Sequence, residues 1–430
     1  MSKHIVVVGG GIGGLATAYN LRRLAKDMRI TLISNRPYFG FTPAFPHLAL
    51  GWRSFEDITV PLAPLLPKFG IEFINEAAES LDPEACKVKL RSGKEISYDY
   101  LVIATGPKLV FGVKGQEENS LSICTVEHAM ETHRKLEEFY ENPGPVVIGA
   151  IPGVSCFGPA YEFAFMLNHE LVKRGIRHKV PITYLTSEPY IGHFGLGGVG
   201  PSRRMMEDLF AEKDIKYIAN VKVGAIEKDR VVYEDLDGNT HEIETKLTMF
   251  MPRFEGPDFV ASAGDKVANP KNKMVIVNRC FQNPTYKNLY GVGVVCAIPP
   301  VENTPVPTGA PKTGQMIEGM AMAVALNIIN DIHNSPDRYA PTLAAICIAD
   351  MGREAAGFVA NPVIPPRAWV KTKKAVWIHW LKTAFEKYFL WKVKKGNIAP
   401  WFEEKVLELA LRLRPVELCK ECDGTPGSRC

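Results

Sequence analysis

Short apolar runs alternate with helical patterns along the first three quarters of the chain. His4–Val8 is a largely apolar run, as expected for a strand buried on both faces, and a glycine-rich turn and a helical pattern follow it. Residues 30–33, 100–103 and 145–148 have the same character. Strands that alternate with helices predict an α/β fold with parallel sheets, here two Rossmann-like dinucleotide-binding domains.

A different pattern begins near residue 377. Large apolar residues recur there at steps of three and four, which predicts a helix with an apolar face. Residues 396–400, Gly-Asn-Ile-Ala-Pro, interrupt the pattern, and it resumes over residues 401–414. The apolar positions of the two segments include Trp377, Trp380, Leu381, Ala384, Phe385, Tyr388, Phe389, Trp391, Phe402, Val406, Leu407, Leu409, Ala410 and Leu413.

Basic residues surround this apolar face. Residues 371–414 hold eleven Lys or Arg and four Glu, a net charge of +7, together with four of the six Trp. Two amphipathic helices with Trp at the rim and Lys for anionic headgroups would lie in a membrane interface. The alternative is a helical hairpin packed on the body of the protein or at a subunit contact. The flanking lysines are Lys373, Lys374, Lys382, Lys387, Lys392, Lys394 and Lys395.

The overall composition is that of an ordered globular protein. The 430 residues are 46% hydrophobic and 23% charged, which suits two or three domains and excludes a disordered or collagen-like chain. No apolar run reaches the ~18–20 residues that a membrane-spanning helix requires. The first residues pass directly into a strand, so we expect no secretory signal peptide. The net charge of +4 is too small to imply binding of nucleic acid.

The first glycine-rich turn has the G-x-G-x-x-G spacing of a dinucleotide site. Glycines between a strand and a helix let the backbone approach a pyrophosphate, and the helix N-terminus supplies N–H donors. Ser34 and Asn35 replace the acidic residue that usually binds the ribose, and the hydroxyl of Ser34 can still bind it. The glycines of the turn are Gly9, Gly11, Gly13 and Gly14.

Two later segments extend this nucleotide site. Residues 100–106, a buried strand that ends in Ala-Thr-Gly, and residues 289–294 resemble, together with the first turn, the FAD domain of glutathione-reductase-like flavoproteins. Most members of that fold family have Asp after the late glycine, where this chain has Val294. The contact of that Asp with the ribityl–phosphate must then come from the backbone or elsewhere. The three motifs together predict FAD.

The second strand–turn–helix unit departs from the dinucleotide pattern. Ile151 replaces the second glycine of the turn, and two prolines remove N–H donors, so the NADH site of related flavoproteins is predicted to be lost. Cys156 lies in this turn, near a helix N-terminus whose dipole favours a thiolate. Glu162, one and a half turns later, can accept or relay a proton. The alternative for Cys156 is a buried residue in a tight turn.

The other cysteines have varied surroundings. Cys347, in a strand-like run, and Cys124, before a polar helix, are simplest as core residues when each is taken alone. Cys86, Cys280 and Cys296 are expected to be small buried hydrophobic residues.

Three cysteines near the C-terminus form a separate group. Cys419, Cys422 and Cys430 suit a metal knuckle, a disulfide or a redox relay. No His lies nearby, which disfavours zinc, and we predict no metal. A structural disulfide is favoured, and it would fit an oxidising compartment.

The cysteines and their neighbours resemble the sulfide:quinone oxidoreductases, especially the thermophilic bacterial enzymes of that family. The resemblance runs from the FAD motifs into the basic C-terminal stretch and covers essentially the whole chain. The segments that carry it are residues 122–128 (SICTVEH), 149–162, 187–193 (SEPYIGH), 304–314 (TPVPTGAPKTG) and 345–350 (AICIAD).

This resemblance implies a reaction in which hydrogen sulfide is oxidised to sulfane sulfur, FAD takes two electrons and a membrane quinone receives them. Cys156 and Cys347 would be the redox pair, bridged by sulfur or as a disulfide. Hydrosulfide attacks the bridge, and the Cys347 thiolate delivers the electron pair to the flavin. Cys124 matches a position that in some members attaches to the FAD 8-methyl group and in others acts in catalysis or sulfur release, and we favour the thioether.

The resemblance also implies residues for the sulfide and flavin sites. His128, Glu162 and His193 match polar residues of the sulfide side, as proton carriers or attractants for HS⁻, although both histidines also suit a structural role. The resemblance and the motifs together give the expected FAD-binding residues as Gly9, Gly11, Gly13, Gly14, Ser34, Asn35, Thr42, Ala78, Thr105, Gly106, Cys124, Gly293, Val294, Lys312, Thr313 and Gly314.

On the quinone side, the resemblance implies that Ile346 and Phe385 sandwich the ring. Glu318 and Lys382 would be its polar contacts, with Lys382 as a proton donor. The expected protein is peripheral (monotopic) on the bacterial inner membrane, on its periplasmic face, against an anionic lipid surface and as a homo-oligomer. The expected parts are an FAD-binding domain at 1–110 and 271–335, a second Rossmann-like domain at 111–270, and a quinone and membrane region at 336–430.

Three other functions are compatible with parts of this pattern. A type II NADH:quinone oxidoreductase has the same fold, but the turn at Ile151 and Pro152 argues against an NADH site. The flavin subunit of a flavocytochrome c sulfide dehydrogenase has no need of the apolar C-terminal tail. A membrane-associated flavoprotein scaffold with vestigial cysteines would show no dependence on Cys156 and Cys347.

Overall fold

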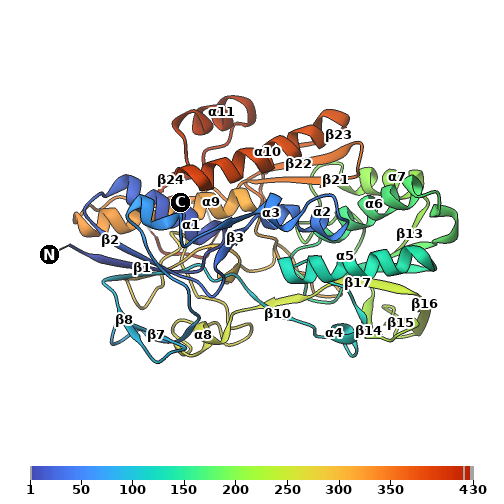
Figure 1. Cartoon of the computed structure of the whole chain (residues 1–430), viewed down its shortest axis with the longest axis horizontal. Helices are drawn as coiled ribbons and strands as arrows, with labels where there is room; N and C mark the ends of the chain where they lie inside the picture. Colours follow the sequence, from blue (N-terminus) through green and yellow to red (C-terminus); the bar gives the residue numbers. More distant parts are fainter. Residues whose placement is uncertain (1, 420–421, 427–430) are drawn as a thin grey trace.

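Two parallel β-sheets organise the chain (Figure 1). The computed structural model describes residues 2–419 and 422–426. The strands of the first sheet are all parallel and come from segments far apart in sequence, which is the doubly wound arrangement that the pattern of apolar runs predicts. In spatial order they are β19 (Leu289–Gly291), β9 (Tyr100–Ile103), β1 (His4–Val8), β2 (Arg29–Ile33) and β5 (Glu72–Ile74).

The second sheet has four parallel strands, and they lie beside helices from the middle of the chain (Figure 1). Its strands in spatial order are β13 (Ile215–Ala219), β12 (Ile182–Thr186), β11 (Val146–Ala150) and β17 (Leu247–Met251). The accompanying helices are α5 (Val126–Glu141), α6 (Gly158–Lys173) and α7 (Ser202–Glu212). The side chains of β11 are all buried, in agreement with the apolar run that predicted this strand.

Two long helices accompany the first sheet. Helix α1 (Ile12–Leu24) begins directly after Gly11, and α9 (Gly314–Ile332) packs against it. Because both helices begin beside the carboxyl ends of the strands, their N-termini lie at the edge where parallel sheets bind nucleotides. Small antiparallel sheets extend this framework. They comprise β6 (Ala78–Asp82), β7 (Lys87–Leu90) and β8 (Glu95–Ser97), and β14 (Lys222–Ile226), β15 (Arg230–Glu234) and β16 (Thr240–Glu244).

A third region is formed by the last hundred residues. The antiparallel sheet of β21 (Ala345–Asp350), β22 (Ala355–Asn361) and β23 (Trp369–Ala375) leads directly into α10 (Val376–Lys395), and α11 (Trp401–Leu411) follows a short turn. These two helices lie along one side of the molecule, at the top in Figure 1. Two further strands, β20 (Arg338–Pro341) and β24 (Val416–Cys419), pair with each other. The two helices and the turn between them agree with the sequence pattern.

Helix α10 has apolar side chains on two faces. Ile378, Phe389, Leu390 and Val393 are buried against the body of the protein. Nine of the fifteen exposed large apolar side chains among the described residues belong to α10 and α11. Those nine are Val376, Trp377, Trp380, Leu381, Phe385, Trp391, Phe402, Val406 and Leu409. The helix therefore packs on the protein with one face, as the hairpin alternative expects, and exposes another, for which membrane contact stays a prediction.

Three side chains of this segment, those of Phe389, Lys382 and Lys392, differ from the sequence prediction. Phe389 belongs to the buried face, where its ring lies 6.0 Å from that of Phe39. Lys382 and Lys392 are buried in ion pairs with carboxylates from distant segments, so they do not serve as lysines for headgroups. Within the described residues, no helix combines the length and the apolarity needed to cross a bilayer.

A disulfide links the segment after β24 to the body of the protein. Cys280, expected only as a small buried hydrophobic residue, forms a disulfide with Cys422. The favoured disulfide therefore exists for Cys422, and its partner lies 142 residues earlier in the chain. Cys430 lies outside the described residues.

We expect the buried face of α10 to be an important source of stability. Phe389→Ala should lower the free energy of unfolding by ~3–5 kcal/mol, because a buried ring that contacts Phe39 and Phe41 is lost and leaves a cavity. Trp380→Ala, at a side chain that is 65% exposed on the same helix, is the matched control and should change it by less than about 0.5 kcal/mol. Urea unfolding followed by circular dichroism measures both, and equal losses would contradict this packing.

Candidate active site

Three free cysteines from separate segments meet near the start of α6. Cys156 lies two residues before that helix, Cys347 lies on β21, and Cys124 lies two residues before α5. A Cβ placed on Gly158, the first residue of α6, would lie 3.6 Å from Sγ of Cys347. Cys124 and Cys347 are also both close enough to Cys156 to raise the pKa of its thiol. The fold therefore brings together cysteines that sequence alone leaves as separate core candidates.

The protonation of these thiols corrects the prediction from the helix end. Burial raises the pKa of Cys156 to about 12, and those of Cys124 and Cys347 to about 11. Each side chain is partly accessible, yet the surrounding protein removes enough water to make a thiolate costly. Positive charge lowers the pKa again at two of the thiols, from Lys312 at Cys156 and from Lys382 at Cys347.

The glycine-rich turn has the open backbone that a dinucleotide needs. Gly9 has a φ of +124°, and a Cβ on Gly14 would collide with the carbonyl of Gly9, so both positions require glycine. No atom of the described residues lies within 4 Å of the Cβ position of Gly11, nor of that of Gly106, which follows β9. The strand edge therefore has room for a pyrophosphate.

The start of α9 contributes a second part of the cradle. Thr313 precedes the first residue of this helix, and its Oγ1 is buried without a hydrogen-bond partner among the described residues. A buried hydroxyl of this kind implies a missing acceptor or donor. Lys312 lies beside it, and burial lowers the pKa of its ammonium to about 8. The residues present therefore fit a polar, electron-accepting ring system such as a flavin.

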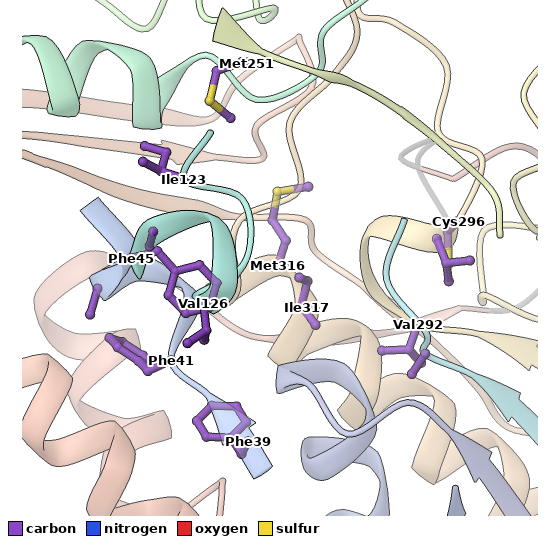
Figure 2. Close-up of a cluster of buried hydrophobic side chains, with 14 of the residues drawn as sticks. Phe39, Phe41, Phe45, Ile123, Val126, Met251, Val292, Cys296, Met316 and Ile317 are labelled. Atoms are coloured by element: carbon purple, nitrogen blue, oxygen red, sulfur yellow. The ribbon is translucent and has the colours of Figure 1, made fainter. Parts of the chain in front are cut away.

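Apolar side chains surround the same region (Figure 2). They include Ile123 next to Cys124, Met251 at the end of β17 and Val292 between β19 and the late glycine. Met316 and Ile317 in the first turn of α9 belong to the same cluster. Such a lining suits the flat faces of a flavin ring.

The other residues expected to bind FAD are placed less uniformly. Ser34 is buried and its hydroxyl already pairs with the backbone of Arg36, while Asn35 and Thr42 are exposed. Ala78, on β6, is half-buried. The remaining expected positions lie in the turns after β9 and β19 and at the start of α9, namely Thr105, Gly106, Gly293, Val294 and Gly314.

A buried ion pair lies beside Cys347. Nζ of Lys382 on α10 contacts Oε1 of Glu162 on α6, and the same Oε1 accepts a hydrogen bond of 3.2 Å from the backbone N–H of Asp350. Burial raises the pKa of Glu162, and Lys382 opposes that rise. Glu162 and Lys382 were expected on the sulfide and quinone sides, and the structure shows that they form one pair.

Asp350, at the end of β21, lies at the centre of a second polar group. Its carboxylate accepts hydrogen bonds from Nε2 of His47 at 3.1 Å and from Nδ1 of His379 at 2.9 Å. These hydrogen bonds keep the pKa of Asp350 well below its usual value despite its burial. Burial lowers the pKa of His47 to about 4. Sequence reasoning did not find this group because its members lie 29 and 303 residues apart, and no local motif joins them.

The two histidines predicted for the sulfide side have different environments. His193 is buried with partners on both ring nitrogens, since Nδ1 accepts from the N–H of Gly195 at 3.1 Å and Nε2 lies 2.7 Å from Glu302. This arrangement favours its structural role. His128 is half-buried near Phe111, burial lowers its pKa, and its Nδ1 has no hydrogen-bond partner among the described residues. His128 is thus the one more available for proton transfer.

The residues predicted to bind quinone lie around β21 and α10. Phe385 is partly exposed on α10, 6.2 Å between ring centroids from Phe41, and Ile346 lies on β21 next to Cys347. Glu318 is not paired with Lys382. It contacts the buried Nζ of Lys392 at 2.9 Å, Glu403 on α11 shares the same ammonium at 3.0 Å, and burial raises the pKa of Glu318 to about 7.

The turn that replaces an NADH site is closed by its own hydrogen bonds. The N–H of Gly153 donates to the carbonyl of Pro307 at 2.7 Å, and the N–H of Gly309 donates to Val154 at 2.8 Å. Ile151 is buried in the same turn. An amide that already donates within the protein does not reach a pyrophosphate, which agrees with the loss predicted from the sequence.

Comparison with known proteins identifies the family of the chain. Residues 3–315 match the family described as pyridine nucleotide-disulphide oxidoreductase. The sulfide-quinone reductase of Aquifex aeolicus is 74% identical over 430 residues, which covers all of both chains, and a crystal structure of the enzyme from that bacterium matches with a TM-score of 0.99 over both chains. A type II NADH:quinone oxidoreductase of Staphylococcus aureus is 25% identical over 74% of this chain and 81% of its own.

The fold and the cysteine site thus define a flavoprotein of the pyridine nucleotide-disulphide oxidoreductase class. Within that class the chain belongs to the sulfide-quinone reductase family. The type II NADH:quinone oxidoreductases are distant relatives.

We expect Lys382 to be essential for keeping Glu162 charged. Lys382→Met should lower the free energy of unfolding by ~3–5 kcal/mol at neutral pH, because a buried carboxylate loses its partner. The pKa of Glu162, already raised by burial, then rises further. A raised folded-state pKa costs stability above that pKa, so the loss should shrink as the pH is lowered.

Urea unfolding of this variant at about neutral pH and at about pH 5 tests the expectation. Lys387→Met, at an exposed lysine of the same helix, is the control and should show little change at either pH. A deficit in Lys382→Met that is independent of pH would mean that Glu162 is not the group left unpaired.

Proposed function

We propose that the protein oxidises hydrogen sulfide to sulfane sulfur and passes the electrons to a quinone. The observation that carries the proposal is the meeting of Cys156 and Cys347 beside the flavin cradle, in a chain that is 74% identical to a sulfide-quinone reductase along its whole length. Paired thiols take up sulfur by disulfide exchange, which is the chemistry that sulfide oxidation requires.

The cysteines perform the sulfur chemistry. In the oxidised protein a sulfur bridge joins Cys156 and Cys347. Hydrosulfide attacks the sulfur of Cys156, the bond to Cys347 breaks, and its electron pair leaves on the Cys347 sulfur as a thiolate. This leaving thiolate is costly because burial raises its pKa to about 11, and the ammonium of Lys382 offsets part of the cost. Removal of the electron pair from the two cysteines then closes a bridge that is one sulfur longer, so each further round of attack and oxidation lengthens the chain until it is released as polysulfide or elemental sulfur.

The flavin cofactor is proposed to be FAD. The pyrophosphate would lie over Gly9, Gly11 and Gly14, and the ring would lie near Lys312 and Thr313. When bound, it accepts the electron pair from the cysteines and hands it to quinone. Lys312 supplies positive charge and Thr313 a hydroxyl next to that ring. We further propose a thioether from Cys124 to the FAD, supported by its position beside Cys156 and by the resemblance described above.

The quinone is proposed to bind between β21 and α10. Phe385 and Ile346 would enclose its ring, and Lys382 would donate a proton to a ring oxygen as the quinone is reduced. The buried pairing of Glu318 with Lys392 makes it a more distant group, which holds α11 on the body of the protein. Cys347 and Ile346 are neighbours on one strand, so the sulfide and quinone sites share β21.

The exposed apolar side chains of α10 and α11 are proposed to insert into a membrane interface. Trp377 and Trp380 are more than half exposed, and Lys373 lies 5.6 Å from the ring of Trp377. Aromatic side chains with neighbouring cations suit an anionic lipid surface. A peripheral position on the periplasmic face of the bacterial inner membrane and a homo-oligomeric state complete the proposal, and both rest on the family resemblance.

We expect sulfide alone, without NADH, to bleach the blue absorption band of the flavin, and decylubiquinone to restore it. Cys156→Ala and Cys347→Ala should each slow bleaching by at least about 10³-fold, because the sulfur bridge is lost. Cys86→Ala, at a free cysteine outside the site, is the matched control and should bleach normally. Anaerobic stopped-flow absorbance makes the measurement.

The same experiment separates the alternatives. Bleaching by NADH, with sulfide inert, would establish the type II NADH:quinone oxidoreductase function in place of this proposal. Bleaching by sulfide in both cysteine variants would exclude the cysteine route, and a flavin that only a c-type cytochrome reoxidises would favour the flavocytochrome.

Membrane attachment is expected to depend on the exposed aromatic residues of α10. The double variant Trp377→Ser and Trp380→Ser should bind vesicles containing anionic phospholipid at least about tenfold more weakly, since two apolar anchors are removed. Leu236→Ser, at an exposed apolar residue of the loop between β15 and β16, is the control. Vesicle co-sedimentation measures binding, and unchanged binding of the double variant would assign this face to another contact.

A further inference from the structure

The buried carboxylate of Asp350 has no role in the proposed sulfur or quinone chemistry, although it lies next to both. It is fully buried, and it accepts hydrogen bonds from His47, His379 and the N–H of Gly352. Its own N–H donates to Glu162, so the Asp350 group is in direct contact with the Glu162–Lys382 pair. No group of three potential ligands suited to a metal ion was found among the described residues.

Charge is not balanced in this cluster when both histidines are neutral. Two carboxylates, Asp350 and Glu162, then face a single ammonium, that of Lys382. Arg53 and Glu386 lie nearby but neutralise each other in an ion pair of 2.7 Å, and His169 is a further imidazole close enough to feel the charge of Asp350. Loss of a proton from Lys382 would leave two buried negative charges, which strongly favours uptake of a replacement proton.

The cluster also extends from the interior to the surface. His379 and Lys382 are three residues apart on α10 and therefore lie on the same side of the helix. The side chain of His379 is 18% exposed, whereas that of Lys382 is 10% exposed and contacts Glu162. On the inner side, Nδ1 of His47 is buried without a hydrogen-bond partner among the described residues. Histidines on either side of an ionised carboxylate are well suited to transfer protons.

The proposed reaction requires such a supply. Oxidation of HS⁻ to sulfane sulfur releases one proton and two electrons, whereas reduction of a quinone to a quinol consumes two protons and two electrons. The sum, HS⁻ + H⁺ + Q → S⁰ + QH₂, takes one proton from solvent in each turnover. A proton that leaves Lys382 for the quinone must therefore be replaced.

We propose that His379, held on its inner side by Asp350 and His47, is the relay that returns protons from solvent to the Lys382–Glu162 pair. His379 takes up the proton from the interface and returns it to Lys382, three residues away on the same side of α10, while Asp350 orients the ring through its hydrogen bond and His47 holds the carboxylate in place. The three are positioning residues that act through Lys382. This inference rests on the proposed function, because a quinone must be the acceptor.

The test separates the two halves of turnover in the intact flavoprotein. Asp350→Asn should leave bleaching by sulfide within about twofold of the parent, and should slow reoxidation by decylubiquinone about tenfold or more. The rate of reoxidation in this variant should fall further as the pH rises, because fewer protons are available while the relay is blocked. The solvent deuterium isotope effect on this rate should increase. Asp331→Asn, at a largely buried carboxylate of α9 paired with Arg338, is the matched control and should resemble the parent.

A second variant and a second measurement distinguish the loss of proton transfer from a structural disturbance caused by Asp350→Asn. His379→Asn keeps a small polar side chain at the interface and should give the same selective, pH-dependent slowing. In protein without sulfide or quinone, the ring ¹⁵N shifts of selectively labelled histidines should place the bonding proton on Nε2 of His47 and Nδ1 of His379, and Asp350→Asn should alter both.

Each outcome decides the inference. Equal slowing of both half-reactions, or slowed reoxidation with an unchanged pH profile and isotope effect, would overturn the relay. Unaltered histidine shifts in Asp350→Asn would do the same. A parent protein that sulfide does not reduce would instead remove the proposed function itself, and that result is visible before any variant is made.

Discussion

The buried ion pair between Lys382 and Glu162 is the interaction on which the organisation of the site depends. It joins α6, which begins beside Cys156, to α10, which carries the exposed apolar face, and it does so next to Cys347 on β21. A buried charge is tolerated only with a partner, so the two helices are constrained to meet at this point. The same constraint places an ammonium near Cys347, which is proposed to leave as a thiolate, and near the space proposed for quinone.

Helix α10 has one face inside the protein and another face that is exposed, and its sequence reflects both environments. The ring of Phe389 packs on Phe39 and Phe41 inside the protein, while Trp380 on another face is mostly exposed. The buried Lys392 joins Glu318 of α9 to Glu403 of α11, so charge as well as apolar contact fastens the segment to the body. A helix held this firmly would stay attached to the site beneath it while its outer face meets the proposed lipid surface.

The fold could be predicted from the sequence because its strands and helices follow local patterns of apolar and polar residues. Apolar runs identified β1, β9 and β11, and three- and four-residue steps identified α10 and α11. The errors arose where distant residues decide the outcome. Lys382 and Lys392 resemble lysines for headgroups until Glu162, Glu318 and Glu403 are placed beside them. Likewise the start of α6 suggests an acidic Cys156, whereas burial by other segments raises its pKa to about 12. The arrangement of His47 and His379 around Asp350 has no local signature at all.

The disulfide between Cys280 and Cys422 encloses α9, β21, α10 and α11 in a single covalent loop of the chain. Such a crosslink restricts the unfolded chain and favours the assembled C-terminal region. It also exists in a protein whose proposed substrate, hydrosulfide, is itself a reagent that cleaves disulfides. The complete burial of Cys280 leaves access only from the side of Cys422. The molecule thus combines opposite requirements: the bridge proposed for Cys156 and Cys347 would have to be open to attack, whereas the disulfide at Cys280 would have to be shielded from it.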